Sequence, residues 1–399
     1  MKTREVKLGE VANVKGGKRI PKGIGLINIP NGHPYIRVRD LNNKRLLELD
    51  NSYEYVDNET QKVISKYTVK TGDVVLSIVG TIGLVAIVGR TLDGANLTEN
   101  CVKLSSFHGV NRDFLYYYLR SDCGQQEIRC GTVGAVQAKL PIKNIQNIAI
   151  NLPDYTTQER IASLLLSIDR KIELNQKIND NLEQQAQSYF QELFVDNADP
   201  EWAIGTISDL GTVVGGSTPS KAKPEYYTES GIAWITPKDL SINKSKFVSH
   251  GENDITELGL KNSSAAIMPE GTVLFSSRAP IGYIAIAAGE VTTNQGFKSV
   301  VPKPEIGTPF VYFFLKNTLP VIEGMASGST FKEVSGSTMK NVPAVIPDAE
   351  TLAKFSDFCA PIFAQQRILE EQNQSLATLR DNLLPKLMSG EIDVSAVQL

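Results

Sequence analysis

The chain of 399 residues is a tandem duplication, and this feature limits its possible folds more than any other. Six blocks recur in the same order, which indicates duplication rather than chance. Four share one offset of 199 residues: 11–17 recur at 210–216, 39–41 at 238–240, 72–77 at 271–276, and 82–83 at 281–282. Two later blocks slip slightly: 114–119 match 310–315, and 143–144 match 340–341. Solenoid repeats run roughly 20–50 residues, so this longer unit is domain-sized.

The same order of strands and helices is predicted for each copy of the repeat. A β-rich, glycine-punctuated region comes first, with apolar runs at 74–79 and 272–276, and a short aromatic helix follows at 113–119 and 309–315. A long helix closes each copy. The first is expected to begin near Thr156, where Thr156 and Glu159 form a capping-box pattern. The second is expected to begin near 348 or 351, and Pro385 predicts a kink or an end because proline lacks the backbone donor.

Both long helices carry a stripe spaced alternately by four and three residues, which is typical of a coiled-coil seam. The apolar seam residues are Ile161, Leu165, Ile168, Ile172 and Leu182 in the first helix, and Phe355, Ile362, Leu369, Leu376 and Leu383 in the second. Polar residues at other seam positions (Asn175, Asn179, Gln366, Asn373) cost stability but can fix the register. The alternative is two separate amphipathic helices, each packed on its own domain.

The predicted fold class is α+β, with two similar β-rich domains separated by two long helices that form an antiparallel coiled coil. An internal pseudo-twofold repeat relates the two halves. The expected boundaries are 1–155 for the first domain, 156–195 for the first helix, 196–347 for the second domain, 348–390 for the second helix and 391–399 for a tail.

Composition excludes several classes of protein. No apolar run approaches the roughly 18 residues that span a bilayer, and the charged N-terminus lacks the apolar segment of a secretory signal. We therefore expect a soluble, cytoplasmic protein with no membrane partner. The four cysteines and three histidines match no zinc or redox spacing, so no metal site is expected.

The formal net charge of -3 hides an asymmetry between the halves. Residues 1–155 hold 21 Lys/Arg and 15 Asp/Glu, a net charge of +6, whereas residues 196–350 hold 12 and 17, a net charge of -5. Phosphate contacts need only local Lys and Arg, so a basic groove on the acidic second domain remains possible. The alternative is an ordinary solvated face.

The catalytic motifs that we tested do not fit, so no catalytic residue is assigned. Neither a Walker A loop nor an adenine-methyltransferase loop is present. Asp154, Asp169 and Lys171 resemble a metal-nuclease pattern, but such sites place the second carboxylate and the lysine on a strand. Here they lie within the predicted long helix. A metal-dependent nuclease is kept as the least favoured alternative.

The loops are more informative. Segments 77–83 and 276–282 (with Arg278), 98–100 and 293–295 follow strand-like runs and carry hydroxyl, basic and amide groups. Arg, Lys, Asn and Gln are the side chains that pair bidentately with base edges. On two similar domains, these loops fit a two-site reader of an extended polymer.

The chain resembles the specificity (S) subunits of type I restriction–modification systems along its whole length. The segments that carry the resemblance are Gly-Gly-Ser-Thr-Pro-Ser-Lys at 215–221, Arg-Ala-Pro-Ile-Gly at 278–282, Thr-Asn-Gln-Gly-Phe at 293–297, the helix segments 158–162 and 168–172, and the ending at 383–392. The first domain departs from the pattern, since Gly-Gly-Lys-Arg-Ile-Pro-Lys at 16–22 replaces the Gly-Gly-Ser-Thr-Pro form.

The resemblance implies two target-recognition domains that each read one half of a bipartite, gapped sequence in double-stranded DNA. The paired helices would space the half-sites, and each repeat would dock one of two methyltransferase (M) subunits. Restriction (R) subunits would complete the nuclease. The chain itself would be non-catalytic and hold no cofactor, while S-adenosylmethionine, ATP and Mg would belong to the partner subunits. The alternative from another class is a duplicated protein-binding scaffold that never touches DNA.

DNA contacts are predicted from polar or basic side chains in the loops and near the repeated blocks. In the first domain they are Lys15, Lys18, Arg19, Arg37, Arg39, Lys139 and Lys143. In the second they are Ser217, Thr218, Lys221, Lys238, Arg278, Asn294, Gln295 and Lys332.

Overall fold

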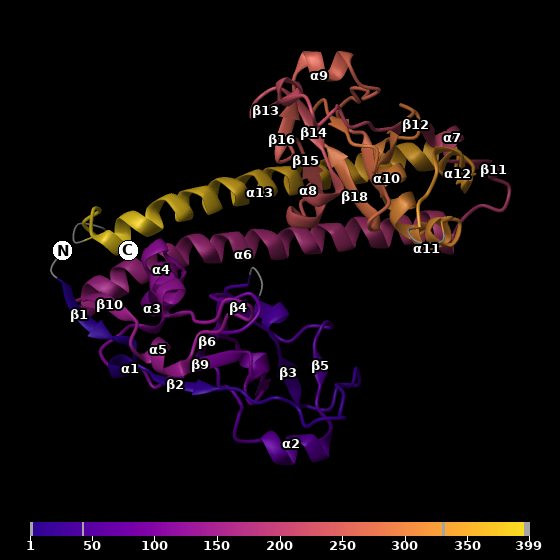
Figure 1. Cartoon of the computed structure of the whole chain (residues 1–399). Helices are drawn as coiled ribbons and strands as arrows, with labels where there is room; N and C mark the ends of the chain where they lie inside the picture. Colours follow the sequence, from indigo (N-terminus) through magenta and orange to yellow (C-terminus); the bar gives the residue numbers. More distant parts are fainter. Residues whose placement is uncertain (1–2, 42–43, 329–331, 395–399) are drawn as a thin grey trace. The chain divides into compact units, whose positions relative to one another are not determined.

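The computed structural model describes residues 3–41, 44–328 and 332–394, and its chain divides into two compact units. Unit 1 comprises Met1–Ile172 and Ser375–Leu399, and unit 2 comprises Glu173–Gln374. Two long helices, α6 (Tyr155–Gln191) and α13 (Ala349–Ser389), each contribute a segment to both units (Figure 1). Each unit is therefore a globular region together with one segment of each helix.

The globular part of unit 1 is built from three sheets. A five-stranded sheet has the order β2 (Asn13–Gly16), β9 (Cys101–Ser105), β6 (Val74–Ser77), β7 (Val85–Val88), β4 (Leu46–Leu47). A three-stranded sheet has the order β5 (Glu54–Tyr55), β3 (Pro34–Ile36), β8 (Asn96–Leu97), and β1 (Thr3–Lys7) pairs with β10 (Ala149–Pro153). The short helices are α1 (Leu8–Val11), η1 (Val38–Leu41), α2 (Asn58–Ile64), η2 (Arg90–Leu92), α3 (Arg112–Arg120), α4 (Asp122–Gly131) and α5 (Ile142–Gln146).

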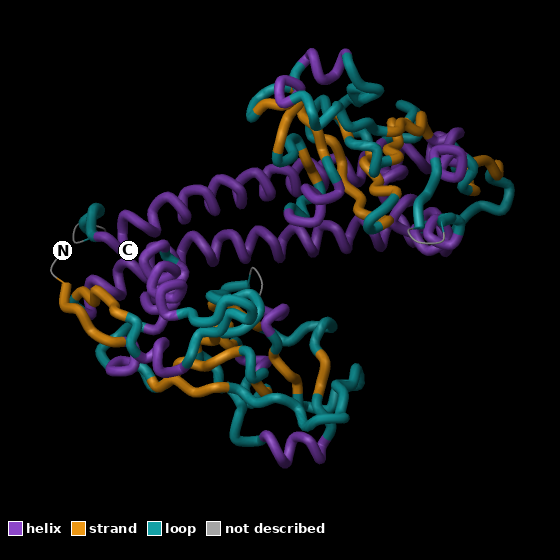
Figure 2. Tube along the Cα trace, viewed as in Figure 1, coloured by secondary structure: helices purple, strands orange, loops and turns teal. Residues whose placement is uncertain are grey.

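Unit 2 repeats this topology. Its five-stranded sheet has the order β12 (Gly211–Gly215), β20 (Lys298–Pro302), β17 (Val273–Ser277), β18 (Ile281–Ala287), β15 (Phe247–Val248). A second sheet has the order β13 (Tyr227–Thr228), β16 (Asn253–Ile255), β14 (Ile232–Ile235), β19 (Thr292–Thr293), and β11 (Ala203–Thr206) pairs with β21 (Pro343–Ile346). The short helices are η4 (Pro224–Tyr226), α7 (Ile207–Leu210), α8 (Pro237–Ile242), α9 (Glu257–Lys261), α10 (Thr308–Asn317), α11 (Leu319–Gly324) and α12 (Gly336–Lys340). The predicted α+β fold with two similar β-rich domains is confirmed (Figure 2).

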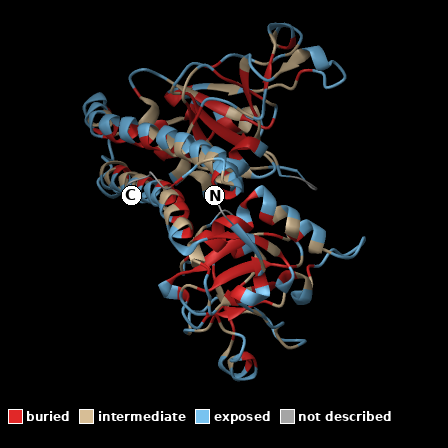
Figure 3. Ribbon diagram, turned by 90° about the vertical axis from the view of Figure 1, so that its left-hand side faces the viewer, coloured by how far each residue is buried: buried red, intermediate tan, exposed pale blue. Residues whose placement is uncertain are grey.

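The central strand of each large sheet is buried on both faces, which explains its unbroken apolar sequence. In β6, Val74 and Leu76 face the core that includes α3, whereas Val75 faces a second core on the other side of the sheet. In β17, Val273 and Phe275 face the core that includes α10, and Leu274 faces the opposite one. Figure 3 shows buried residues concentrated in the sheets and exposed residues along the outer side of the long helices.

Both long helices begin at an aspartate followed three residues later by threonine. Asp154 accepts hydrogen bonds from the backbone nitrogen of Thr157 (3.0 Å) and from its hydroxyl (2.6 Å). Asp348 makes the same two contacts with Thr351, at 2.9 and 2.8 Å. The expected cap at Thr156 is therefore wrong, because the Asp154 carboxylate occupies that role and the helix begins at Tyr155.

The apolar stripes of α6 and α13 turn toward the cores of the two units. In unit 1, the core includes Ile161 and Leu165, with Leu383 packed against it, while Ile168 is buried and Ile172 and Leu376 are half-buried. In unit 2, the core includes Phe355 and Ile362, with Leu182 packed against it, and Leu369 is buried. Each helix thus contributes apolar residues to both cores.

Polar contacts show that α6 and α13 run antiparallel. Asn175 contacts Asn373, and four residues further along α6 the Asn179 side chain contacts the backbone of Gln366, so one residue number rises as the other falls. The sequence predicts that the second long helix ends or kinks at Pro385. The predicted end is wrong, because α13 continues to Ser389. Pro385 lies in the last turn, and the helix continues for only four residues beyond it.

A buried lysine joins the helix pair of unit 2 to its globular part. Lys246 precedes β15 and donates hydrogen bonds to Glu183 on α6 (2.8 Å) and Gln366 on α13 (2.9 Å). Its ammonium also lies 3.4 Å from the ring centroid of Phe363. Burial lowers the pKa of Lys246 to about 8, against the opposing effect of Glu183. This cluster fixes the edge of the large sheet to both long helices.

Candidate nucleic-acid interface

The candidate interface is built on a pair of loops that each unit forms in the same way. In unit 1, the segment after β2 lies against the segment after β8: the backbone nitrogen of Lys18 donates to the carbonyl of Leu97 (2.8 Å). A side chain at Gly17 would place its Cβ 2.1 Å from the Thr98 carbonyl oxygen, so only glycine allows this approach. The Tyr35 hydroxyl donates to the Lys18 carbonyl (2.8 Å) and supports the loop from below.

Unit 2 makes the same three contacts with different residues. The backbone nitrogen of Ser217 donates to the Thr293 carbonyl (2.9 Å), and a Cβ at Gly216 would lie 2.1 Å from the Asn294 carbonyl oxygen. The indole nitrogen of Trp234 donates to the Ser217 carbonyl (3.0 Å), in the position that Tyr35 occupies in unit 1. We call 17–19 with 97–99, and 216–218 with 293–295, the loop pair of each unit.

The side chains at the tips of the two loop pairs differ in chemistry. Arg19 in unit 1 donates through Nε to Glu99 at 2.5 Å, and its side chain is 79% exposed. Burial raises the pKa of Glu99, but the hydrogen bond and charge of Arg19 lower it further, so the net pKa is below the ordinary value. In unit 2, the Thr218 hydroxyl donates to the side-chain oxygen of Gln295. One tip is thus a charged pair and the other a neutral one.

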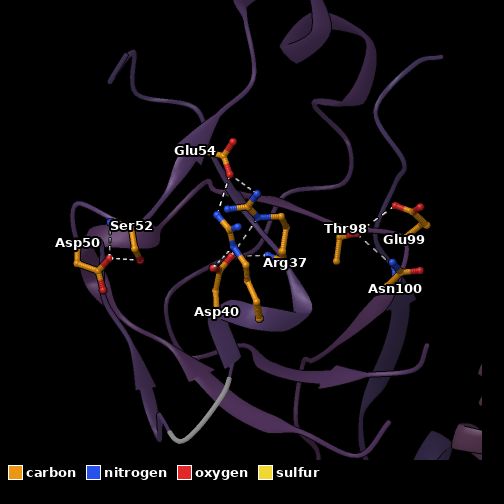
Figure 4. A network of polar contacts seen from close by, with 9 residues as sticks. Arg37, Asp40, Asp50, Ser52, Glu54, Thr98, Glu99 and Asn100 are labelled. Atoms are coloured by element: carbon orange, nitrogen blue, oxygen red, sulfur yellow. Dashed lines mark hydrogen bonds and ion pairs between the residues drawn. The ribbon is translucent and has the colours of Figure 1, made fainter. Parts of the chain in front are cut away.

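A second polar cluster lies beside the loop pair of unit 1 (Figure 4). Arg37 and Arg39 both donate to the carboxylate of Glu54, with Arg39 Nη2 at 2.7 Å, so the predicted basic residues are paired with an acid. The buried Asp40 accepts from the Arg37 backbone nitrogen at 2.7 Å. Burial raises the pKa of Asp40 to about 6, and the charges of Arg39 and Lys44 limit the rise.

In unit 2, a depression of about 660 Å³ lies over the loop pair. Six of the eight side chains predicted there to contact DNA line it: Thr218, Lys221, Lys238, Arg278, Asn294 and Gln295. The structure therefore brings together residues that lie up to 77 positions apart in the chain. Ser217 belongs to the loop pair but does not line the depression, and neither does the exposed Lys332.

Two basic residues of this depression are paired with carboxylates. Lys238 contacts Glu252 at 2.5 Å, and Arg278 lies 3.5 Å from Glu333. Lys221 is exposed and has no carboxylate partner within the described part of the chain. The surface therefore combines compensated charges with at least one lysine available to a new anion.

The remaining predicted lysines of unit 1 are exposed but scattered. Lys15 lies on β2, Lys18 on the loop pair, Lys139 in a bridge with Val79, and Lys143 on α5. Lys15, Lys139 and Lys143 make no ion pair with any residue that the structure describes. Whether they contact DNA stays a prediction, as it does for the other residues named from sequence.

Sequence reasoning missed the acids that face the basic residues. Glu54, Glu99 and Glu252 were not among the predicted side chains, although each pairs with one of them. Glu99 could have been found, because the slipped offset of the later blocks aligns it with Gln295. Glu54 could not, because its contact depends on the pairing of β3 with β5.

The nuclease alternative does not agree with the positions of its residues. Asp154 immediately precedes α6 and Asp169 lies within it, 15 residues further along the chain. This spacing separates them by roughly 22 Å along the helix axis and prevents them from sharing a metal. Asp154 caps the helix, and Asp169 accepts hydrogen bonds from Tyr117 (2.6 Å) and Arg380 (2.9 Å). Within the described residues, no group of three or more His, Cys, Asp or Glu could hold a metal ion.

None of the helices that the structure describes is both long enough and apolar enough to cross a bilayer.

The chain is thus a duplicated α+β protein that presents an equivalent polar loop pair on each of its two units. Residues 2–184 and 200–379 match the family model described as type I restriction modification DNA specificity domain. The two matches cover both repeats, so the chain belongs to this family. The resemblance expected from the sequence motifs is thereby confirmed, and the scaffold and nuclease alternatives are not favoured.

Individual relatives carry corresponding names. Over 191 residues the chain is 39% identical to the type I restriction enzyme MjaIX specificity subunit of Methanocaldococcus jannaschii, a match covering 46% of this chain and 44% of that protein. Over 341 residues it is 24% identical to the HindI specificity subunit of Haemophilus influenzae, covering 67% of this chain and 73% of that one. The matched part thus spans less than half of the first relative and about three quarters of the second.

A solved structure shares the fold. The S subunit of a type I restriction–modification system from M. genitalium aligns with a TM-score of 0.59 and 17% sequence identity, covering 96% of this chain and 95% of that one. At this identity the likeness extends to the fold alone.

Proposed function

We propose that this chain is the DNA-sequence-recognition subunit of a type I restriction–modification complex, and that each unit reads one half of a bipartite, gapped target. The observation that carries the proposal is the loop pair. Both units form the loop pair with the same backbone contacts, but the side chains at its tip differ between the units. A constant scaffold with variable polar tips is suited to reading two different base sequences.

Contacts to phosphate and to bases have separate roles in such a complex. Phosphate contacts position a protein on the duplex, whereas contacts to base edges in the grooves specify the sequence. Exposed lysines without a carboxylate partner, such as Lys15, Lys143 and Lys221, fit the first role. The tips of the loop pairs, with their amide, hydroxyl and guanidinium groups, fit the second.

The acidic character of the second domain does not oppose DNA binding. Lys221, Lys238 and Arg278 line one depression, so local positive groups gather there although residues 196–350 carry a net charge of -5. Glu252 and Glu333 neutralise two of these groups in the free protein. We expect binding to exchange those carboxylates for phosphate oxygens at a modest energetic cost, because exposed ion pairs contribute about 0–1 kcal/mol.

We propose that catalysis belongs to partner subunits. Each repeat would dock one methyltransferase subunit, which would carry S-adenosylmethionine and transfer the methyl group to adenine. Restriction subunits would supply the ATP- and Mg-dependent nuclease. The positions of Asp154 and Asp169, one capping a helix and the other buried against an arginine, support a non-catalytic role for this chain.

The proposal is tested by DNA binding of the chain purified together with its methyltransferase subunit. The probe is a synthetic duplex that carries the methylated site of this complex. The affinity should fall steeply from about 50 to 200 mM salt, and Lys221→Ala should reduce the slope of log K against log salt by about one. Lys303→Ala is the matched control, because Lys303 follows β20 at the end opposite to Gln295. Salt-insensitive binding, or none, would overturn the proposal.

A further inference from the structure

We infer that the Arg19–Glu99 pair and the Thr218–Gln295 pair are equivalent base-reading positions, the first selecting a G·C base pair in one half-site and the second an A·T base pair in the other. The inference rests on the proposed function and deepens it. It assigns a base preference to each tip and includes Glu99, which was not among the side chains expected to contact DNA.

The equivalence follows from the backbone. In unit 1 the backbone nitrogen of Lys18 donates a hydrogen bond to the carbonyl of Leu97, and in unit 2 Ser217 makes the equivalent hydrogen bond to Thr293. The next residue along the first loop is Arg19 or Thr218. The residue two positions further along the second loop is Glu99 or Gln295. The two pairs therefore occupy one place on one scaffold, and their own hydrogen bonds join the same two positions.

The scaffold below the pairs is built from equivalent contacts in both units. Gly17 and Gly216 permit an approach that any Cβ would block, and an aromatic side chain, Tyr35 or Trp234, holds the loop carbonyl from the core side. Both aromatic side chains are buried, at 3% and 6% exposure. The glycine and the aromatic side chain that support the loop pair are equivalent in both units, whereas the side chains at its tip differ. We therefore attribute the difference between the units to the base pair that the tip recognises.

The unit 1 pair matches the major-groove pattern of G·C. Arginine donates two hydrogen bonds to O6 and N7 of guanine, and a carboxylate accepts from the N4 amine of cytosine. Arg19 uses Nε for Glu99, which leaves both terminal nitrogens for guanine. Arg19 also offsets the charge of Glu99, which allows a carboxylate to approach the groove without adding net negative charge.

The unit 2 pair matches the pattern of A·T. Glutamine bonds bidentately to N6 and N7 of adenine, and a threonine methyl group contacts the methyl group of thymine. The Thr218 hydroxyl donates to the Gln295 side-chain oxygen and orients the amide. The second lone pair of that oxygen remains to accept from the adenine N6 amine, and an amide N–H remains to donate to N7. Both side chains border the open depression of about 660 Å³, so a duplex has access to them.

The test exchanges the pairs within the intact complex of this chain with its methyltransferase subunits. Arg19→Thr with Glu99→Gln places the unit 2 tip on unit 1, and Thr218→Arg with Gln295→Glu does the reverse. Methylated sites are mapped by sequencing in a host without other adenine methylation. The expected result is a change of one base pair in one half-site, G·C to A·T for the first exchange, with the other half-site unchanged.

Binding measurements keep the test decisive if an exchanged complex does not methylate. With duplexes substituted at each position in turn, Arg19→Ala should lose discrimination of about five- to 150-fold at a single G·C position. Lys18→Ala, the neighbouring exposed lysine, should instead weaken all duplexes evenly. Discrimination lost at an A·T position, or at none, would overturn the inference while leaving the proposed function intact. A wild-type complex without a two-part motif would overturn the proposed function instead.

Discussion

Asn175 of α6 donates a hydrogen bond of 2.9 Å to the side-chain oxygen of Asn373 on α13, a residue 198 positions away. Asn175 is fully buried, and its own side-chain oxygen has no hydrogen-bond partner within the described structure. A hydrogen-bonded pair of amides in a coiled-coil seam fixes the register at a cost in stability. The pair thus fixes how the antiparallel helices of this chain align.

Replacing both residues with leucine should therefore raise stability and weaken register. We expect Asn175→Leu with Asn373→Leu to increase the free energy of unfolding by about 1–3 kcal/mol, because the substitution removes the buried Asn175 amide, whose oxygen has no partner in the described structure. Sedimentation should then detect assemblies that the wild type does not form. Gln176→Leu, at an exposed position of α6, is the control. A double variant that is less stable and keeps one assembly state would contradict this role.

Asp169 is predicted to be structural. Its carboxylate is 6% exposed and accepts hydrogen bonds from Tyr117 and Arg380. Asp169→Ala leaves the half-buried Arg380 with Asp381 alone and the buried Tyr117 hydroxyl without its acceptor, which should cost about 1–3 kcal/mol. Calorimetry should show a lower melting temperature for unit 1. The tryptophan fluorescence transition should move less, since Trp202 and Trp234 both lie in unit 2. Asp180→Ala, on an exposed face of α6, is the control.

The nuclease alternative makes the opposite prediction for the same variant. Mg²⁺-dependent cleavage of DNA by the isolated chain, abolished by Asp169→Ala in a protein of unchanged stability, would refute the structural role.

The buried cluster around Lys246 predicts a pH dependence of unit 2. Burial raises the pKa of Glu183, but the charges of Lys246 and Lys316 lower it to about 2, from an ordinary 4.5. The stability that this carboxylate contributes is thus complete above pH 4.5 and disappears as pH falls toward 2. Glu183→Gln should destabilise unit 2 at pH 6, and the difference from wild type should shrink by pH 3.

Urea unfolding followed by tryptophan fluorescence measures this difference. The neighbouring Gln184 is exposed, so Gln184→Ala should leave the unfolding curve unchanged at both pH values. An effect of Glu183→Gln that stays constant from pH 6 to pH 3 would show that its ionisation does not stabilise the fold.

The duplication allowed the fold to be predicted because the repeated blocks carry the scaffold itself. The shared offset places Gly17 on Gly216 and Ser77 on Ser276, and both pairs make backbone contacts that any copy of the fold needs. Regular spacing likewise identified both long helices. These glycine, serine and helix-stripe positions are constrained by local geometry, so their pattern can be recognised in a single sequence.

The site was less predictable because its contacts depend on strand pairing. Arg37 and Arg39 stand out as basic in the sequence, but their partner Glu54 lies on β5, and nothing in the spacing reveals that β3 and β5 are paired. The helix cap was misassigned for a related reason. Asp154 and Thr156 both offer an oxygen, and only the position of the first helical turn decides between them.

If the chain reads two half-sites as proposed, we expect the length of the helix pair to set the distance between them. One heptad inserted into α6 after Ile172, with a matching heptad in α13 after Gln374, lies where the two units divide and lengthens the pair by about 10 Å, the length of roughly three base pairs. The unread spacer in the methylation motif should lengthen accordingly, while both half-sites stay the same. An unchanged spacer in a folded, active complex would show that the helices do not set the distance.

The methylation motif that this chain specifies is the most direct readout of its two units. The measurement is genome-wide mapping of methylated adenines in a host that expresses this chain with its methyltransferase subunit and no other adenine methyltransferase. We predict one gapped, two-part motif, and substitutions at the loop pair of unit 1 should change one part only. A continuous motif, or methylation that does not depend on this chain, would contradict the central claim that its two units read two half-sites.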